Sequence, residues 1–556
     1  MVHFDEDKQL RRAEELRKQE AERFAQMIAS NTGLPYIDLS LVSISPDGLA
    51  LIDEQTARAT KVAVFHMTGK LVSLAAVTPT DPKVIAIADK LRVAGYNVNI
   101  YIATENSLER AWKYYEDIHK AEQTKVGQID VSPEALLKFA DMVKSLEDAK
   151  RLVEEAYADK SSARATVMLE ILLGSAISLE ASDIHMEPEE TKVRVRFRLD
   201  GILHDITDFD AHTYKLVLSR IKLLSSLKLN VESARQDGRF SVTLDKGEID
   251  MRTSIIPGAY GESSVMRILN PESINVNLEQ LGMTPQLLEI IRKEIARPNG
   301  LILNTGPTGS GKTTTLYTFL RAVNEQGTKI ITIEDPIEYH VEGIVQTQVN
   351  PKKGYTFFEG LKSAMRQDPD IIMVGEIRDS DTAGTAVDAA LTGHLVFSTL
   401  HTNNAAGTIP RLIDLGINPK VLGPALSVAM AQRLVRRLCK NCKKERPIEE
   451  KERVVIEARV ATLKVIGISR EVPKNLFGTV GCAICNNTGY KGRLGIYEVI
   501  LVDQSIEEIL PSAPSEHEVY KLARKQKIPD MAEDGIMKVL DGITTIEELE
   551  RVVDLV

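Results

Sequence analysis

The sequence of 556 residues is too long for a single hydrophobic core and predicts three or four domains. Charged residues make up 27% of the chain and aromatic residues 5%, as in ordinary globular domains. The formal net charge of −10 excludes the overall basic character of a dedicated nucleic-acid binder. The first residues contain no apolar signal-peptide core, and no long uncharged apolar run follows. We therefore expect a cytoplasmic protein with at most a peripheral membrane contact.

Residues 1–116 have the mixed pattern of a small α/β domain. A polar stretch and a Ser-Pro helix start follow, so residues 117–160 are interpreted as a linker and a helix, and the domains on either side are expected to move relative to one another. The elements predicted within the first domain are an amphipathic helix at 5–30, strands at 62–65, 71–74 and 98–102, and a helix at 82–94.

Residues 161–275 predict a second domain that begins with a helix at 162–181. In the strand expected at 193–198, apolar and arginine residues alternate, which places Val193, Val195 and Phe197 on a core face and three arginines on the other face. Further arginines recur in the strands that follow. Arg239, Arg252 and Arg267 are candidates for phosphate contacts, and a solvated surface charge is the alternative for each of them.

The third domain, 276–556, contains the most informative motif of the chain. A short apolar run at 301–305 predicts a buried strand, and the glycine-rich turn after it opens a helix with the spacing G-x-x-x-x-G-K-[ST]. Such a turn directs backbone N–H groups at phosphates, so the expected ligands are ATP and Mg²⁺, with Lys312 on the β- and γ-phosphates and Thr313 on the metal. The expected nucleotide-binding residues of this loop are Gly306, Pro307, Thr308, Gly309, Ser310, Gly311, Lys312, Thr313 and Thr314.

Acidic residues follow two of the next apolar runs. One run ends in Glu334, Asp335 and Glu338, and a second ends in Glu376. Because ligands bind at the carboxyl ends of the strands in an α/β sheet, these acids are expected beside the nucleotide. We assign Mg²⁺ to Glu376 together with Thr313, and leave the attacking water to either Glu338 or Glu334.

Two histidines, His394 and His401, bracket the next apolar run and are candidates for sensing the γ-phosphate. Hydrolysis also needs positive charge on the transferring phosphoryl group. If the second domain folds over the phosphate loop of its own chain or of a neighbour, Arg239, Arg252 and Arg267 would act as arginine fingers.

The four cysteines form two C-x-x-C pairs, Cys439 with Cys442 and Cys482 with Cys485. In a reducing compartment this pattern is typical of a structural Zn²⁺ site with four thiolate ligands and no open position, although free buried thiols or redox chemistry are alternatives.

A basic cluster follows the first part of this domain, at Arg433, Arg436, Arg437, Lys440, Lys443 and Lys444. It is compatible with an acidic lipid surface or a protein partner, with nucleic acid, or simply with a helix that packs Leu434, Val435 and Leu438. The alternative function is therefore a RecA-like nucleic-acid translocase or DNA-uptake ATPase, which the acidic pI of about 5.7 disfavours. A small-molecule kinase would need an acceptor-site signature, which the sequence does not contain.

These segments together resemble the type II secretion and type IV pilus assembly ATPases over roughly residues 35–550. The resemblance is carried by the phosphate loop, the cysteines and four further runs, namely Glu334–Glu338, Met365–Asp379, Thr392–Thr402 and Gly489–Glu498. It implies an α/β protein with a RecA-like P-loop domain, a PAS-like α/β second domain that carries the arginine fingers, an N-terminal α/β domain and a zinc-binding sub-domain at about 436–490.

The resemblance also implies a homohexameric ATPase motor at the inner face of the cytoplasmic membrane. Such a motor drives pilus assembly or protein secretion through an inner-membrane platform protein, while its first domain docks to a membrane-associated partner; no nucleic acid is expected. Retraction motors of the family lack the first domain and the cysteines, so the chain is expected to be an extension or secretion motor, with a preference for pilus assembly. The Arg-Leu-Gly repeats that bind cyclic di-GMP in some members do not occur in residues 1–115, so such control is not expected.

Overall fold

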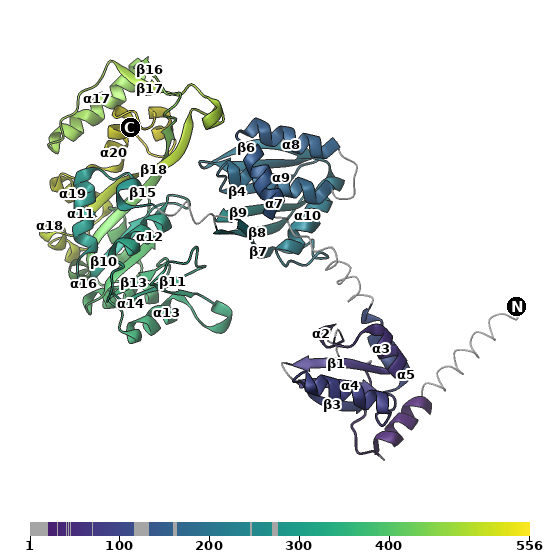
Figure 1. The fold of residues 1–556 in the computed structure, drawn as a ribbon. Helices are drawn as coiled ribbons and strands as arrows, with labels where there is room; N and C mark the ends of the chain where they lie inside the picture. The colour runs from purple at the N-terminus through teal and green to yellow at the C-terminus, as the bar shows by residue number, and fades with distance from the viewer. Residues whose placement is uncertain are drawn as a thin grey trace, which may run out of the picture. The chain divides into compact units, whose positions relative to one another are not determined.

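The computed structural model describes residues 20–30, 32–39, 42, 44, 46–49, 51–68, 71–115, 133–158, 164–244, 247–269 and 276–555. The chain divides into two compact units, Met1–Asp130 and Val131–Val556 (Figure 1). Of the helix predicted at 5–30, residues 20–30 are helical, and residues 5–19 lie outside the described part. Among the described helices, none combines the length and the hydropathy needed to cross a membrane.

The first unit is built on a three-stranded sheet with β2 in the centre. β1 pairs with β2 in the antiparallel direction, and β3 pairs with the other edge of β2 in the parallel direction. The predicted strands and the helix between β2 and β3 are confirmed. The elements are α2 (Pro46–Leu49), α3 (Glu54–Thr60), β1 (Val62–Thr68), β2 (Leu71–Ala76), α4 (Pro82–Val93), β3 (Asn97–Ile102) and α5 (Glu105–Trp112).

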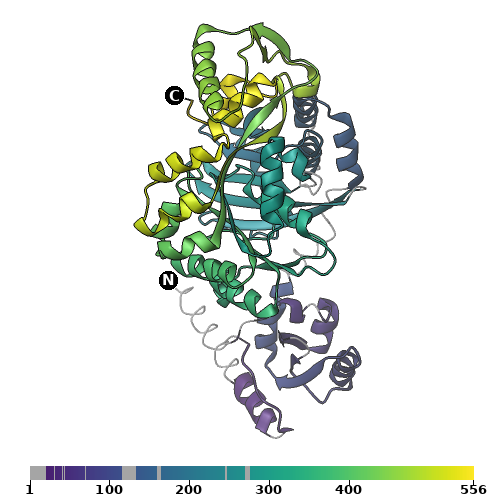
Figure 2. The ribbon, with the colours of Figure 1, turned by 90° about the vertical axis from the view of Figure 1, so that its left-hand side faces the viewer.

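The second unit begins with a six-stranded antiparallel sheet in the order β6-β5-β4-β9-β8-β7, whose strands Figure 2 shows side by side. Val193, Val195 and Phe197 are buried and the arginines between them are not, which confirms the predicted alternation. The elements are α7 (Pro133–Met142), α8 (Leu146–Ala158), α9 (Arg164–Ser178), β4 (Asp183–Pro188), β5 (Val193–Leu199), β6 (Ile202–Phe209), α10 (Ala211–Leu224), β7 (Gln236–Leu244), β8 (Gly247–Gly258) and β9 (Gly261–Leu269).

Helices α7 and α8 fall in the segment interpreted as a linker and a helix, but they pack into the core of the six-stranded sheet. Leu136 of α7 and Leu152 and Val153 of α8 are buried in the same cluster as Phe197 of β5. Their apolar faces are covered, so the stretch 133–158 is part of a folded body rather than a spacer.

The rest of the second unit is organised by a seven-stranded sheet in the order β12-β11-β13-β14-β10-β15-β18. All neighbours are parallel except β15 and β18, which run side by side in opposite directions (Figure 1). Its strands are β10 (Gly300–Thr305), β11 (Ile330–Glu334), β12 (Val345–Gln348), β13 (Ile371–Val374), β14 (Leu395–Leu400), β15 (Leu426–Leu438) and β18 (Tyr490–Leu501).

Helices precede, connect and follow the strands of this sheet. They are α11 (Pro285–Ile295), α12 (Lys312–Val323), α13 (Phe357–Ala364), α14 (Ser380–Leu391), α15 (Thr408–Asp414), α16 (Pro419–Ala425), α17 (Glu450–Val465), α18 (Gln504–Glu507), α19 (Glu516–Ala523), α20 (Met531–Leu540) and α21 (Ile546–Glu550). A small antiparallel pair, β16 (Lys444–Pro447) and β17 (Asn475–Gly478), lies beside the cysteine segment.

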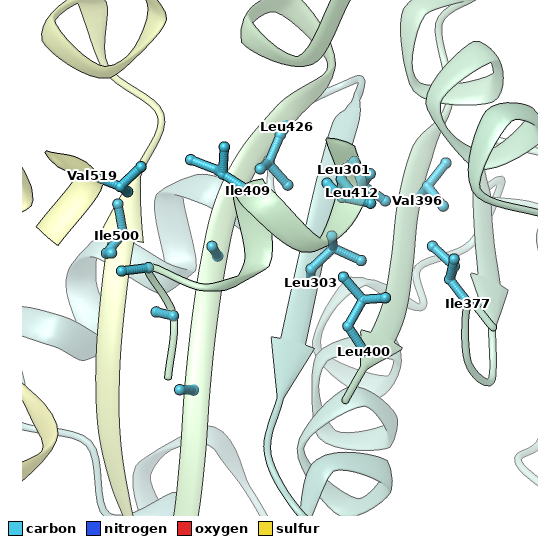
Figure 3. Close-up of a cluster of buried hydrophobic side chains, with 14 of the residues drawn as sticks. Leu301, Leu303, Ile377, Val396, Leu400, Ile409, Leu412, Leu426, Ile500 and Val519 are labelled. Atoms are coloured by element: carbon cyan, nitrogen blue, oxygen red, sulfur yellow. The ribbon is translucent and has the colours of Figure 1, made fainter. Parts of the chain in front are cut away.

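Apolar side chains fill both faces of the seven-stranded sheet. On one face, Leu301 and Leu303 of β10, Val396 of β14 and Ile500 of β18 share a cluster with α15 and α19 (Figure 3). Phe397 of β14 points into a separate cluster on the other face. A parallel strand buried on both faces is a continuous apolar run, which is why these strands were recognisable in the sequence.

Leu434, Val435 and Leu438 lie in a strand together with the three arginines of the basic cluster, so the predicted helix that packs them is wrong. Lys440 and Lys443 lie in the turn that follows, and Lys444 begins β16. β15 extends over residues 426–438 between β10 and β18. The spacing of these apolar residues suits a helix, but pairing with β18, which continues to Leu438 beyond the last β10 partner at Ala431, overrides that local preference.

One carboxyl group, that of Glu498 in β18, is buried in this core. Its Oε1 accepts a hydrogen bond from the Ala405 N–H at 3.0 Å, which anchors the loop that follows β14. Burial raises the pKa of Glu498 to about 7, and the charges of Asp530 and Glu516 add to the effect. The folded state therefore holds this proton at pH values where an unfolded glutamate has lost it.

Replacing Leu303 with alanine should lower the free energy of unfolding of the second unit by about 2–5 kcal/mol, because it leaves a cavity beneath a fully buried strand. Urea unfolding followed by far-UV circular dichroism measures the change. The only tryptophan, Trp112, lies in the first unit, so its fluorescence transition should not move. Val465→Ala, at a side chain that is 84% exposed, is the matched control, and equal effects of the two variants would contradict the assigned core.

The raised pKa of Glu498 predicts a pH dependence of stability with a defined sign. Because the folded state binds more protons than the unfolded state between the ordinary value of 4.5 and about 7, stability should fall as the pH rises through that window. The thermal midpoint should therefore drop more between about pH 5 and about pH 8 in the wild type than in Glu498→Gln, which cannot ionise. The control is Glu471→Gln at an exposed position. An identical drop in wild type and Glu498→Gln would show that the group does not titrate as stated.

Candidate functional site

The phosphate loop leaves the carboxyl end of β10 and leads into α12, as the sequence predicts. Gly306 has φ of +142°, and a Cβ there would lie 2.5 Å from the carbonyl oxygen of Gln432. Gly311, the residue before α12, has φ of +90°, and a Cβ there would lie 2.8 Å from Gln432 Nε2. Both positions therefore require glycine for conformation and for space.

The polar side chains of the loop are arranged for an anion at the start of α12. Thr313 is exposed and Lys312 is half-buried. Lys312 Nζ donates to the carbonyl oxygens of Gly306 at 2.7 Å and Pro307 at 3.1 Å, so it folds back over the loop. Burial lowers the pKa of Lys312, the positive charge of Arg433 adds to the effect, and the negative charge of Glu376 opposes it.

Glu334 ends β11 and is buried, with its carboxylate already bound by protein donors. Tyr317 donates its hydroxyl to Oε2, and Thr332 Oγ1 and Gln346 Nε2 donate to Oε1 at 2.6 and 3.1 Å. Asp335, the next residue, is exposed. The carboxylate of Glu334 is thus a fixed part of the sheet edge rather than a free group.

Glu338 is the acid that meets the six-stranded sheet. Arg252 Nη1 lies 2.7 Å from Glu338 Oε2, and Arg252 Nη2 donates to the carbonyl oxygen of Ile337 at 2.7 Å. The two side chains are 27% and 28% exposed, which strengthens the pair relative to one in open solvent. A candidate arginine finger and a candidate catalytic acid therefore neutralise each other.

Glu376 follows β13, and His401 follows the neighbouring strand β14. His401 Nε2 lies 3.2 Å from Glu376 Oε2, and Arg378 contacts the other carboxylate oxygen. Burial works against the charge of Glu376, but the hydrogen bonds from Arg378 and His401 outweigh it and lower the pKa. The carboxylate stays ionised at neutral pH, as a ligand for Mg²⁺ must be.

His394 is not brought to this site within the chain. It precedes β14, whereas His401 follows it, and its backbone carbonyl accepts from the Gly300 N–H at the opposite end of β10. Its Nδ1 lies 3.0 Å from the carbonyl oxygen of Ala389. Strands of this length separate the two histidines by roughly 20 Å.

The three candidate arginines lie in one row across the six-stranded sheet. Arg239 of β7 is directly opposite Arg252 of β8, and Arg252 is directly opposite Arg267 of β9. Residues paired in this way point to the same face of the sheet. Arg239 is exposed, and Arg252 reaches Glu338.

A cavity of about 480 Å³ joins the phosphate loop, the acids and Arg267. This volume is in the range of small-molecule sites. It is lined by Arg267, Thr308, Gly309, Ser310, Gly311, Lys312, Thr313, Thr314, Glu334, Asp335, Glu338, Glu376 and His401, among others. Residues at or just after the carboxyl ends of four parallel strands, β10, β11, β13 and β14, therefore line the same cavity.

Some residues of the site had no role in the sequence analysis. Gln432 of β15 connects the two ends of the phosphate loop, because its Oε1 accepts hydrogen bonds from Asn304 of β10 at 2.8 Å and from Thr315 of α12 at 2.9 Å. The Thr402 N–H donates to Thr305 Oγ1 at 2.7 Å and ties the loop after β14 to the end of β10. Arg493, within the motif at 489–498, lines the cavity. Only the polar interruption of an apolar strand could have indicated Gln432.

The four cysteine sulfur atoms lie within 4.8 Å of one another. The Sγ–Sγ distances are 3.9 Å between Cys439 and Cys482, and 3.7 Å both between Cys442 and Cys485 and between Cys482 and Cys485. Four sulfur atoms bound to one Zn²⁺ lie roughly 3.8 Å apart. The backbone N–H groups of Cys482 and Gly489 also donate to the sulfur of Cys485. The residues present fit a tetrahedral thiolate site.

Part of the basic cluster is engaged within the chain. Arg436 Nη2 lies 2.7 Å from Glu548 Oε2, and its guanidinium lies 4.1 Å from the ring centre of Tyr490. Lys443 Nζ donates to the carbonyl oxygen of Gly542 at 2.7 Å. These contacts weaken the case for a nucleic-acid surface at this cluster.

Comparisons with known proteins agree with this geometry. Residues 158–551 match the family model described as "Type II/IV secretion system protein", and residues 32–122 match the "MshEN domain". The type II secretion system protein E of Aeromonas hydrophila is 45% identical over 385 residues, which are 69% of this chain and 75% of that protein. The type IV pilus assembly ATPase PilB of Myxococcus xanthus is 36% identical over 537 residues, 95% of this chain and 91% of PilB.

Among solved structures, the ATPase DotB of Legionella pneumophila has a TM-score of 0.51 and 22% identity, covering 71% of this chain and 97% of DotB, which shows a common fold. The matches favour a secretion or pilus ATPase over a nucleic-acid translocase. The chain belongs to the type II/IV secretion system protein family and is an ATP hydrolase of the kind that serves protein secretion and pilus assembly.

Proposed function

We propose that the chain binds Mg²⁺ and ATP in the cavity at the carboxyl ends of β10, β11, β13 and β14. The backbone of residues 306–314 cradles the phosphates, and Lys312 turns from the loop carbonyls to the β- and γ-phosphates. Thr313 and Glu376 would hold Mg²⁺, which would supply positive charge to the phosphates. The observation that carries the proposal is the convergence of the loop, the acids and Arg267 on one cavity.

Glu338 is the better of the two candidates for orienting the attacking water. Glu334 already accepts hydrogen bonds from Tyr317, Thr332 and Gln346, which leaves it fewer acceptor positions for a water molecule than Glu338 has. Glu338 is held chiefly by Arg252, which a phosphate can draw away. Binding of ATP would then free Glu338 at the moment when the γ-phosphate arrives.

The arginine row supplies the charge that hydrolysis needs from outside the loop. Arg267 lines the phosphate cavity, and Arg252 reaches its edge through Glu338. A guanidinium fork matches phosphate oxygens, and such arginines accelerate phosphoryl transfer in other NTPases. Arg239 continues the row and would join on closure of the sheet over the nucleotide. His401 senses the presence of the γ-phosphate through its contact with Glu376. His394 could contact a γ-phosphate only if that nucleotide were bound to a neighbouring subunit.

The working form is a homohexamer that acts on an inner-membrane platform protein, and its membrane contact is peripheral. The similarity to PilB over 95% of this chain supports pilus assembly, and the similarity to type II secretion proteins keeps secretion as the second candidate. We assign docking of a membrane-associated partner to residues 1–116, and the arginine fingers to 161–275, whose core includes the helices at 133–158. The ATPase part is 276–556.

Cys439, Cys442, Cys482 and Cys485 would hold one Zn²⁺ as a structural site. Four protein thiolates leave no open coordination position for catalysis. The metal would fix the turn at 482–489 against the end of β15, where the Cys439 N–H donates to the carbonyl oxygen of Gly489 at 2.9 Å.

Replacing Lys312 with alanine should lower ATP turnover at least about a hundredfold, because the transferring phosphoryl group loses its nearest cation. Steady-state release of phosphate measures the rate. Lys464→Ala, at an exposed position on α17, should keep the wild-type rate. Normal turnover in Lys312→Ala would refute the phosphate-loop assignment.

Purified protein should contain about one zinc per chain. Cys482→Ser should lose the metal and lower the thermal midpoint, since the thiolate ligands link segments 43 residues apart. Elemental mass spectrometry and a melting curve measure the two effects. The control is Ile484→Ala, between the ligands at a side chain that is 50% exposed. A metal-free preparation that melts at the same temperature would remove the zinc site.

A further inference from the structure

Asp183 is an almost fully buried carboxylate between two arginines of the six-stranded sheet. The residue is 4% exposed and begins β4. Its Oδ1 accepts from Arg267 Nε at 3.0 Å, and its Oδ2 lies 3.2 Å from Arg198 Nε. Ser182 Oγ also donates to Oδ2 at 2.8 Å. Both carboxylate oxygens are therefore engaged from different directions, which fixes the orientation of the carboxylate.

Strand register explains why this contact forms. Asp183 is directly opposite Arg267 of β9 on one side and Arg198 of β5 on the other. It thus extends the row that begins with Arg239 and Arg252, and all five side chains point to the same face of the sheet. The carboxylate is the one anionic member of this row.

The contact with Arg267 leaves the phosphate-binding part of the guanidinium available. Asp183 engages Nε, whereas a phosphate would be bound by the terminal Nη atoms, as in a fork. Arg267 is 56% exposed and lines the cavity that holds Lys312. Arg198 and Asp183 line a second cavity of about 640 Å³, which Arg267 and residues 307–310 of the phosphate loop also line.

We propose that Asp183 is a positioning residue for ATP hydrolysis: it fixes Arg267 with its terminal nitrogen atoms toward the triphosphate, while Arg198 neutralises the charge that Asp183 would otherwise present to the phosphates. The inference rests on the proposed function. An unrestrained arginine loses rotamer freedom when it binds, and a carboxylate that holds it beforehand removes much of that loss. The triad of two arginines and one carboxylate keeps a net positive charge toward the nucleotide.

The test is a double-mutant cycle in the full-length chain with Asp183→Asn and Arg267→Gln. Asp183→Asn should lower kcat about ten- to a hundredfold with a smaller change in KM, because misplacement of a contact made in the transition state affects the chemical step. If Asp183 acts through Arg267, the double variant should be no slower than Arg267→Gln alone. Multiplicative losses in the double variant would overturn the proposal.

Two further variants separate positioning from folding. Asp208→Asn removes an exposed carboxylate of β6 that pairs with Lys192, and should leave kcat unchanged. If Asp183→Asn lowers the thermal midpoint, Asp183→Glu is the second variant, because it keeps the negative charge at the same strand position and displaces it by one methylene. A lowered kcat of Asp183→Glu at an unchanged thermal midpoint supports positioning. An unchanged kcat of Asp183→Glu overturns the proposal. Lys312→Ala separates the two claims. If that variant is inactive and Asp183→Asn is not impaired, only the role of Asp183 fails, whereas full activity of Lys312→Ala removes the proposed function itself.

Discussion

Arginines placed side by side on one face of a β-sheet repel one another, and the second unit of this protein depends on how that repulsion is offset. Arg239, Arg252 and Arg267 are direct cross-strand neighbours. Like charges in such positions destabilise a sheet. Two anions of the chain itself compensate, with Glu338 on Arg252 and Asp183 on Arg267. A triphosphate would be the third anion, and the row is arranged so that it can compete for the same guanidinium groups.

This arrangement would link nucleotide binding to the relative position of the parallel and the antiparallel sheet. The parallel sheet presents its loop and acids at one edge, and the antiparallel sheet presents arginines on one face. Arg252 and Glu338 join the two sheets. A ligand shifts a conformational equilibrium only by its different affinity for the two states. Because the γ-phosphate is the group that hydrolysis removes, contacts of the arginine row with it would change once in each catalytic cycle.

Sequence reasoning succeeded where a local pattern has one physical meaning. The phosphate loop needs its glycines for conformation and space, and the buried parallel strands are continuous apolar runs, so both were recognisable. The four cysteines are brought together as their spacing indicates. It failed at β15, whose apolar spacing is helical although residues 434–438 pair with β18 as a strand. The sequence could not show whether Glu334 or Glu338 orients the water, because the hydrogen-bond donors around Glu334 come from distant segments. It also could not identify Asp183, because strand register determines which residues Asp183 contacts. His394 shows that a strand with a histidine at each end presents only one of them to the site.

The most direct test of the account is chemical modification of arginine by phenylglyoxal, quantified for each residue by mass spectrometry, with and without Mg²⁺ and a non-hydrolysable ATP analogue. The account predicts that the analogue protects Arg252 and Arg267. Arg235, whose side chain is 75% exposed and lies before β7, should react equally in both conditions. Equal modification of Arg252 and Arg267 with and without the analogue would contradict the claim that this sheet meets the nucleotide.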